Sequence, residues 1–506
     1  MPALAAQRRD APAARWRLGR DYQVIEGGAD TSILFIAGNN RALRVSRDLG
    51  ERLRAGLDFM SAEERAEWEA LIEAGIVSEV NGPKAAASTF TDGSNLAINV
   101  NLTAFCNLGC TYCFAEGGDY GRITGKLEAD MVEDIFAFII EHVSASQTVR
   151  FEFFGGEPLL NFARIREIIE RSEEVEAESG IRFIHRISTN LTVLPRGALE
   201  LLARKSFIVS VSIDGDQKTH DRNRPTKKGE GSYATIMANC RRVREASNEV
   251  TLVARMTVLG GHPTLIENVR GLWRLDLFDY FQIYPGVVPP ELSGILQDED
   301  APSEGKAPRS MSLSFLKQLA EFVGEYPSLI GGGNRFKGVL EYERIADMVL
   351  SGKVALSYCS GGRNYFTFSP DKSIMPCHRL VGDLSMQVGT SQEGLSGKGL
   401  DVWRLPIDGH PVCSQCWIRY ICSGGCKQEN LQATGDLNTP SPEGCTYQIQ
   451  MVENVLSMMA AEPPAYRRRD RVRLDDMFVS CGRPMVLNLR AENAAAPATL
   501  HHFELL

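Results

Sequence analysis

The chain has 506 residues, of which 43% are hydrophobic, and it carries a formal net charge of -9 at pH 7. A chain of this length can bury large cores and should divide into about three domains. The acidic balance argues against nucleic-acid binding, which needs concentrated Lys and Arg, and no apolar run is long enough to cross a bilayer. The 12 cysteines, mostly at short spacings, indicate metal ligands in a reducing, cytoplasmic compartment rather than the disulfides of a secreted protein.

The N-terminal part is expected to be a flexible tail followed by a small domain. Residues 1–20 are rich in Ala and Arg but lack the apolar segment of a secretory signal. Residues 21–83 contain two strand-like runs and then two helical patterns. The second helix should begin after Ser61 as its N-cap, with Glu64 at the capping-box position. This order of elements predicts a winged-helix-like domain.

Strand-like and helix-like segments alternate over residues 92–355. Such alternation implies a parallel sheet with helices on its faces, and six units of this kind predict an α/β fold with an incomplete (β/α)6 barrel. The catalytic groups of such barrels lie at the C-terminal ends of the strands. The expected strands are residues 94–102, 148–156, 181–189, 207–215, 251–259 and 279–287.

Three cysteines follow the first of these strands at the spacing C-x3-C-x2-C, and they are Cys106, Cys110 and Cys113. Three soft thiolates at this spacing can hold three irons of a 4Fe-4S cube and leave the fourth iron without a protein ligand. Judged on these residues alone, a zinc knuckle is the alternative. Short turns follow the next three strands, and they are Gly155-Gly156-Glu157-Pro158, Ser188-Thr189-Asn190 and Ser212-Ile213-Asp214-Gly215.

The cysteine motif, with Tyr112 before its last cysteine and these turns following in order, resembles the radical S-adenosylmethionine (SAM) superfamily. The resemblance implies a 4Fe-4S cluster whose open iron chelates SAM, and cleavage of SAM to methionine and a 5′-deoxyadenosyl radical that takes a hydrogen from the substrate. It also implies that Arg224 helps to hold the SAM carboxylate, where the alternative is a surface ion pair. The SAM-contacting residues implied are Tyr112, Gly155, Gly156, Glu157, Ser188, Asn190, Ser212 and Arg224.

Residues 356–450 carry seven more cysteines. The spacing C-x2-C-x5-C-x3-C over residues 413–426 resembles the SPASM domain, which in relatives holds auxiliary 4Fe-4S clusters, and a zinc ribbon is the alternative. The resemblance implies a distal cluster with four thiolates and a nearer cluster with three. Seven thiolates are one short of the eight that two cubes need, so the nearer cluster would be completed by a non-cysteine ligand, by Cys240 or Cys481, or by nothing. In the last case it would have an iron that a substrate thiolate can occupy. The two groups are Cys413, Cys416, Cys422 and Cys445, and Cys359, Cys377 and Cys426.

Three further expectations concern this region and the chain beyond it. SPASM relatives usually have Gly at the position of Lys372, so we expect Pro370 and Asp371 to make that turn instead. Cys240 and Cys481 are expected to be buried or free thiols rather than ligands. Residues 451–506 should begin as a helix and continue as a tail without assigned chemistry.

The resemblance implies a cytoplasmic oxidoreductase that matures a ribosomally made peptide or small protein. The product would be a cross-link, with a thioether favoured and a carbon-carbon bond as the other form. The small N-terminal domain resembles leader-peptide-recognition domains, which take an extended peptide at a sheet edge, although a purely structural cap is the alternative. Expected partners are the precursor and an electron donor such as flavodoxin or ferredoxin, with no nucleic acid and no membrane.

Two alternatives to this function stay open on the sequence. Anaerobic sulfatase maturases share the architecture and oxidise Cys or Ser to formylglycine. They place an Asp directly after the cysteine that corresponds to Cys377, whereas this chain has His378. The other alternative is a peptide-binding iron-sulfur or zinc scaffold without catalysis.

Overall fold

The computed structural model describes residues 16–77, 96–145, 147–204, 207–259, 264–286, 313–397, 399–461, 486–488 and 500–506. Cys481 and most of residues 1–20 lie outside these ranges. Within them, no helix combines the length and apolar character that crossing a membrane requires.

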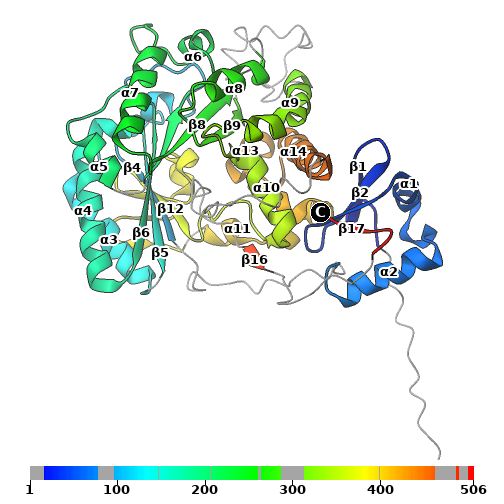
Figure 1. The fold of residues 1–506 in the computed structure, drawn as a ribbon. Coiled ribbons are helices and arrows are strands. Elements are labelled where there is room, and N and C mark those ends of the chain that lie inside the picture. The colour runs from blue at the N-terminus through cyan, green and yellow to red at the C-terminus, as the bar shows by residue number, and fades with distance from the viewer. Residues whose placement is uncertain are drawn as a thin grey trace, which may run out of the picture.

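The N-terminal unit is an antiparallel sheet followed by two helices, as expected (Figure 1). The side chain of Ser61 accepts a hydrogen bond from the Glu64 N–H, and that of Glu64 accepts one from the Ser61 N–H, so the capping box is confirmed. The first strand was not predicted as a separate element. The elements are β1 (Tyr22–Glu26), β2 (Thr31–Ile36), β3 (Arg41–Ser46), α1 (Arg47–Ala55) and α2 (Ala62–Glu73).

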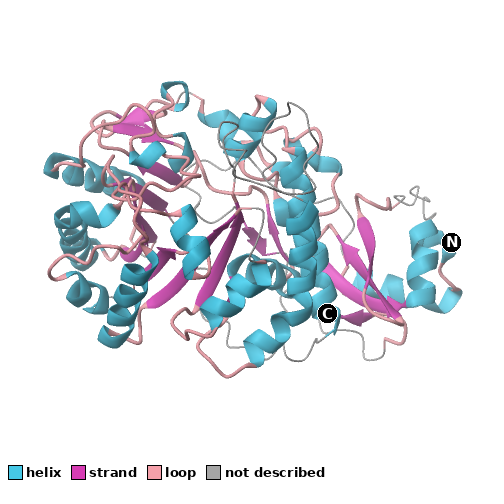
Figure 2. Cartoon of the chain, turned by 90° about the horizontal axis from the view of Figure 1, so that it is seen from above, coloured by secondary structure: helices cyan, strands magenta, loops and turns pink. Residues whose placement is uncertain are grey.

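The centre of the molecule is a parallel sheet of six strands in chain order, with helices around its outside (Figure 2). All six predicted strands are confirmed, and the strand order is open rather than closed into a ring. The strands are β4 (Leu96–Asn101), β5 (Thr148–Phe154), β6 (Arg182–Thr189), β7 (Ile208–Ser212), β8 (Thr251–Val258) and β9 (Tyr280–Pro285). The helices that follow them are α3 (Ala129–His142), α4 (Phe162–Ser179), α5 (Ala198–Arg204), α6 (Gln217–Asn223), α7 (Tyr233–Ala246) and α8 (Leu265–Trp273).

The cysteine-rich part extends this same sheet. Strand β12 (Tyr365–Phe368) pairs in parallel with β4, and β13 (Ser373–Met375), β14 (Gly389–Thr390) and β15 (Gly394–Leu395) continue it in antiparallel fashion. At the other end, β10 (Gly338–Val339) joins β9. The sequence did not predict that β12 belongs to the barrel sheet, because its partner lies far away in the chain.

The remaining helices of the described part lie between residues 313 and 461. The helix expected from Met451 begins earlier, at Pro442, so Cys445 lies in its first turn. These helices are α9 (Leu313–Gly331), α10 (Leu340–Ser351), α11 (Leu400–Arg404), α12 (Arg419–Cys422), α13 (Lys427–Thr434) and α14 (Pro442–Ala461). Two strand pairs complete the described part, in which β11 (Lys353–Ala355) pairs with β16 (Val486–Asn488) and β17 (Glu504–Leu505) pairs with β3. Short 3₁₀ turns lie at Leu57–Phe59, Glu116–Gly118, Pro158–Asn161, His378–Leu380, Leu384–Met386, Ile407–Gly409 and Cys413–Gln415.

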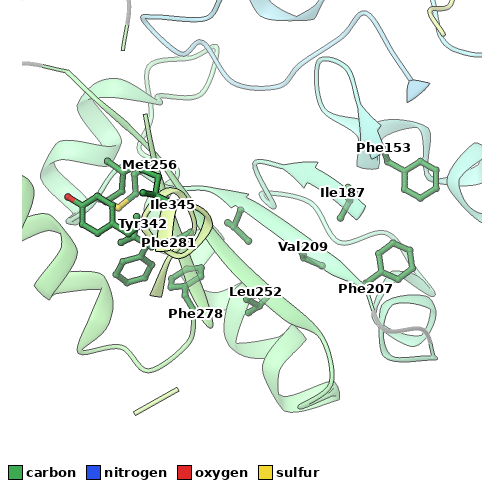
Figure 3. Close-up of a cluster of buried hydrophobic side chains, with 14 of the residues drawn as sticks. Phe153, Ile187, Phe207, Val209, Leu252, Met256, Phe278, Phe281, Tyr342 and Ile345 are labelled. Atoms are coloured by element: carbon green, nitrogen blue, oxygen red, sulfur yellow. The ribbon is translucent and has the colours of Figure 1, made fainter. Parts of the chain in front are cut away.

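The barrel strands alternate between an apolar and a polar set of buried side chains. The apolar set packs into one large cluster with the surrounding helices, and it includes Phe153, Ile187, Val209, Leu252 and Phe281 (Figure 3). The polar set occupies the intervening positions and is equally buried, and it includes Asn99, Glu152, Arg186, Ser210 and Gln282. Burying a polar group costs free energy unless the group binds a partner, so this polar interior indicates that a binding or catalytic site lies in the barrel.

The turn before Cys377 has the predicted residues at its centre, and Lys372 follows them. Lys372 itself adopts the left-handed conformation, with φ of 65°, and its N–H donates to the Ser369 carbonyl at 2.9 Å. This hydrogen bond closes a β-turn whose two central residues are Pro370 and Asp371, so the prediction that these residues make the turn is confirmed. A side chain with a Cβ accepts a cost of about 1–2 kcal/mol in this conformation. The Lys372 ammonium also contacts Asp130 of α3 at 2.6 Å, which fixes the turn against the barrel.

Candidate active site

The loop that carries Cys106, Cys110 and Cys113 is held by backbone hydrogen bonds on two sides. On one side, the N–H of Glu157 donates to the Phe105 carbonyl at 2.8 Å. On the other side, the N–H of Gly109 donates to the Pro225 carbonyl at 2.8 Å, and that of Thr111 to the Asn223 carbonyl at 3.0 Å. The end of β5 and the segment after α6 therefore position the loop together.

Gly155 and Gly156 let two backbone segments approach each other closely. A Cβ at Gly156 would lie 2.2 Å from the Phe105 carbonyl oxygen, and one at Gly155 would lie 2.4 Å from Asn101 Oδ1. Gly155 also has φ of 126°, which favours glycine. Gly156 thus approaches the backbone of Phe105, the residue directly before Cys106. The expected contact of this turn with the SAM amino group stays a prediction.

The three thiols of this loop lie near one another and receive N–H donors. Burial, with smaller contributions from the charges of Glu157, Cys110 and Cys113, raises the pKa of Cys106 to about 12. The Sγ of Cys106 accepts from the Leu108 N–H at 3.5 Å and from Asn190 Nδ2 at 3.7 Å. A bound iron favours the thiolate, and N–H donors stabilise that thiolate. This donor set fits a 4Fe-4S cluster.

Glu157 joins the ends of β5 and β6 beneath the cysteine loop. It is buried, and its carboxylate accepts hydrogen bonds from Thr189 Oγ1 at 2.6 Å and from the Asn190 N–H at 2.7 Å. Burial raises the pKa of Glu157 to about 7. Asn190 in turn donates to Cys106, so this carboxyl and its partners set the position of the first cysteine.

Tyr112, Asp214 and Arg224 form a second buried group beside the loop. Nη2 of Arg224 donates to Asp214 Oδ1 at 3.0 Å, and its guanidinium lies 5.1 Å from the centre of the Tyr112 ring. The Tyr112 hydroxyl donates to the other oxygen of Asp214. Arg224 is thus in an ion pair, as the alternative held, but the pair is buried rather than on the surface. Its role toward SAM stays a prediction.

Ser188 and Ser212 lie at or next to the C-terminal ends of their strands, β6 and β7, as expected. The hydroxyl of Ser188 donates to Glu152 Oε1 at 3.0 Å. It is therefore connected to the polar interior of the barrel. Its expected contact with SAM is not tested by this arrangement.

The seven cysteines of the third region separate into the two groups that the resemblance implies. Burial raises the pKa of Cys422 to about 12, and the thiolate charges of the other three distal cysteines contribute to this shift. Likewise, burial raises the pKa of Cys377, with contributions from Cys426 and Cys359. Cys240 is buried in α7, and the described cysteines are all free of disulfides. Their role as cluster ligands stays a prediction.

No group of three or more His, Cys, Asp or Glu side chains within the described ranges is arranged to hold a single metal ion. A cube takes one thiolate at each of its irons, so its protein ligands stand further apart than the ligands of one zinc ion.

Aromatic and charged side chains lie between the loop of Cys113 and the turn of Cys377. We call Phe114, Tyr120, Phe154, Arg255 and His378 the mouth cluster. Ring centres of Phe114 lie 6.0 Å from Tyr120 and 6.2 Å from His378, and those of Phe154 and His378 are 5.0 Å apart.

Two members of the mouth cluster have perturbed acid-base properties. Burial raises the pKa of Tyr120, and the charges of Cys113 and Cys377 raise it further. Burial, with the charges of Arg255 and Arg379, lowers the pKa of His378 to about 3. Both side chains are therefore uncharged at neutral pH. Tyr120 and His378 therefore lie between the cysteine loop that contains Cys113 and the nearer auxiliary group that contains Cys377.

Arg255 was missed in the sequence analysis. It projects from β8, donates to Ser188 Oγ at 3.3 Å and lies 5.9 Å from the centre of the Phe154 ring and 5.6 Å from that of Tyr284. No carboxylate in the described part of the chain lies within ion-pair distance of it. The available signal was a lone charge at an inward-facing position of an otherwise apolar strand.

Comparison with known proteins agrees with this geometry. Residues 100–265 match the family model described as the Radical SAM superfamily. The cysteine-type anaerobic sulfatase-maturating enzyme of Clostridium perfringens is 22% identical over 64% of this chain and 86% of its own length. That of Clostridium novyi is 25% identical over 64% of this chain and 85% of its own length.

Two solved structures share the fold. Histidine-tagged anSMEcpe with bound AdoMet aligns with a TM-score of 0.61 at 17% identity, over 76% of this chain and 99% of that chain. Native anSMEcpe with bound AdoMet and Cp18Cys peptide aligns with a TM-score of 0.58 at 17% identity, over 72% and 99%. The family match, the sequence relatives and the grouped thiols of the loop agree. Residues 100–265 therefore form a radical SAM domain, and the chain is a SAM-dependent radical enzyme with a 4Fe-4S cluster.

Proposed function

We propose that this enzyme is a maturase that installs a cross-link, preferably a thioether, in a peptide or small protein. The observation that carries the proposal is the group of three cysteines, Cys359, Cys377 and Cys426, which lies next to the mouth cluster through His378. Three thiolates leave one position of a cube for an outside ligand. A substrate thiol held there would be deprotonated and close to the barrel.

The cofactor supplies the reactive species, and the chain supplies position. When bound, the cluster and SAM provide a 5′-deoxyadenosyl radical that takes a hydrogen atom from a substrate side chain. Cys106, Cys110 and Cys113 would hold that cluster, and the Glu157 carboxyl fixes Cys106 through Asn190. The aromatic rings of the mouth cluster would exclude water from the reacting carbon. An electron donor such as flavodoxin or ferredoxin stays a prediction.

Formylglycine formation is the second candidate, because the sequence relatives are sulfatase-maturating enzymes. The chemistry at Cys377 speaks against it. Those enzymes are expected to have a carboxylate next to this cysteine, which acts as a base. Here the neighbour is His378, which accepts or donates a hydrogen bond with the Tyr365 hydroxyl at 2.7 Å and is held uncharged by burial.

A product assay separates the two candidates. The reduced, cluster-loaded enzyme is incubated with SAM and two sets of peptides, cysteine-containing sulfatase peptides and short peptides encoded beside its gene. We expect a peptide of the second set to lose two hydrogen atoms and one alkylatable thiol, without gaining an aldehyde. An aldehyde that reacts with a hydrazide reagent would instead establish formylglycine, and loss of all peptide modification would refute both candidates.

Arg255 is expected to hold an acidic group of the substrate. Burial raises the pKa of Glu341 to about 7 and Arg255 acts to lower it, yet the two are not within ion-pair distance, so the guanidinium remains open to an incoming carboxylate. In Arg255→Gln we expect KM for the modified peptide to rise about tenfold or more, because a charge-assisted hydrogen bond is lost. The KM of Arg255→Lys should lie between that of Arg255→Gln and that of the wild type.

The control for this prediction is Arg166→Gln, which changes an arginine on the outer surface of α4 that is 60% exposed. It should leave KM unchanged. Peptide-independent formation of 5′-deoxyadenosine should be the same in all variants. If Arg255→Gln weakens SAM binding instead, its carboxylate partner belongs to SAM and not to the peptide.

A further inference from the structure

Residues 500–506 add a strand to the N-terminal sheet. Strand β17 pairs antiparallel with β3, with Glu504 opposite Arg44 and Leu505 opposite Leu43. The N–H of Leu506 extends the pairing by donating to the Ala42 carbonyl at 3.0 Å. In Figure 1 this segment, drawn in red, lies against the blue N-terminal elements although it comes from the other end of the sequence. The edge of β3 is thus occupied by the chain's own peptide.

The side chains of this segment fit the edge in an alternating manner. Phe503 is 1% exposed and lies in the core of the N-terminal unit, with its ring centre 5.8 Å from that of Trp68. Leu506 is 4% exposed and belongs to the main core on the other side of the sheet. Main-chain pairing supplies general affinity, and such alternate pockets supply sequence preference.

Charged groups add a second level of selection. The Glu504 carboxylate contacts Arg44 Nη1 at 2.6 Å, and Arg44 Nη2 donates to the Ala460 carbonyl at the end of α14 at 2.6 Å. The Glu67 carboxylate accepts from the N–H groups of His501 and His502, each at 3.0 Å. The site therefore selects an extended segment with an aromatic or large apolar residue, then an acidic residue, then two aliphatic residues.

We propose that residues 500–506 act as an internal competitor at this β3-edge site, in the N-terminal domain that is expected from its resemblance to take the leader of the substrate peptide at a sheet edge. The leader would carry the same apolar-acidic-aliphatic-aliphatic pattern and would displace β17. This inference rests on the proposed function, because it assigns the site to a peptide substrate. The chain's own segment is the evidence for the chemistry of that partner.

The competition has a measurable size. A segment tethered to its site by a short stretch of chain, here the 11 residues 489–499 after β16, has an effective concentration of roughly millimolar. An external peptide can bind only to molecules whose site is free. Its apparent Kd therefore equals its intrinsic Kd divided by the fraction of such molecules. We therefore expect a change that releases the tethered segment to tighten external binding by about tenfold or more.

The test uses a fluorescent peptide with the sequence of residues 499–506, Thr-Leu-His-His-Phe-Glu-Leu-Leu, and the full chain. In the double variant Phe503→Ala/Glu504→Ala, the anisotropy titration should show binding at least about tenfold tighter than to the wild type. Glu504→Ala alone, which keeps the Phe503 anchor, should show a smaller increase. Phe59→Ala, an aromatic truncation in the same unit at a side chain 58% exposed, is the control and should bind as the wild type does.

Several outcomes would overturn the inference. Equal binding of the peptide to the wild type and to both tail variants would show that the segment does not compete. Tight binding that persists in Arg44→Glu would place the peptide elsewhere. If a peptide is modified by the enzyme but its leader does not compete with the labelled peptide, the leader assignment fails while the maturase function stands. If competition is seen but no peptide is modified, the β3-edge site stands and the proposed function fails.

Discussion

The triple variant Cys106→Ala/Cys110→Ala/Cys113→Ala is expected to lose about one cube of iron, roughly four atoms, and all formation of 5′-deoxyadenosine from SAM. The reason is that the open iron exists only while these three thiolates hold the other three irons. Among the described residues, the other cysteine groups belong to the third region, so they are not expected to replace these three ligands. Iron analysis and chromatography of the SAM products measure both losses.

Cys240→Ala is the matched control for this variant. Cys240 is buried in α7 and lies apart from the three cysteine groups, so its removal should leave iron content and SAM cleavage near those of the wild type. Residual SAM cleavage by the purified triple variant would contradict the assignment of the loop. Loss of all iron, rather than of one cube, would show that the other cysteine groups depend on this one.

Gly156→Ala is expected to lower SAM cleavage about a hundredfold or more, since misplacing a reacting group by about 1 Å can have an effect of this size. The added methyl group would lie 2.2 Å from the Phe105 carbonyl oxygen, which has to move, and Cys106 is the next residue. The hydrogen bond from the Glu157 N–H to the same carbonyl would be strained with it. Iron content and SAM cleavage of the reconstituted protein test this expectation.

The control is Gly271→Ala in α8. A Cβ at Gly271 meets nothing within 4 Å, so the same chemical change occurs there in open space. Alanine in place of glycine within a helix should stabilise the fold by about 0.5–1 kcal/mol and leave activity unchanged. If Gly156→Ala retains full activity, the contact of the glycine turn with the cysteine loop does not set the position of Cys106.

The sequence predicted features that depend on local pattern. Six strands, their chain order and the residues at their C-terminal ends follow from alternating hydrophobicity and from the rule that barrel sites lie at those ends. The three cysteine groups follow from spacing together with the family resemblance. Cys445 lies outside the motif of residues 413–426, and its proximity to Cys422 was implied by the family resemblance alone.

Features that depend on contacts between distant segments were not predictable. Arg255 and Tyr120 acquire their positions only when β8 and the cysteine loop meet at the barrel mouth. The pairing of β17 with β3 joins segments far apart in the chain, and hydrophobic pattern alone does not specify a partner. At the turn before Cys377, the local pattern correctly predicted Pro370 and Asp371 as the turn residues, but the contact of Lys372 with Asp130 of α3 was not predictable.

The continuity of the sheet from β4 into β12 has a mechanical consequence. Tyr365 to Phe368 pair residue by residue with Ala97 to Val100, so the cysteine-rich part and the barrel share one hydrogen-bonded framework. Hinge closure would require breaking this ladder, and a rigid frame of this kind does not adjust to its ligand. The spacing between the loop of Cys113 and the turn of Cys377 is therefore fixed before any substrate arrives. We therefore expect a substrate to bend to reach both, and flexible peptides to be better substrates than rigid ones.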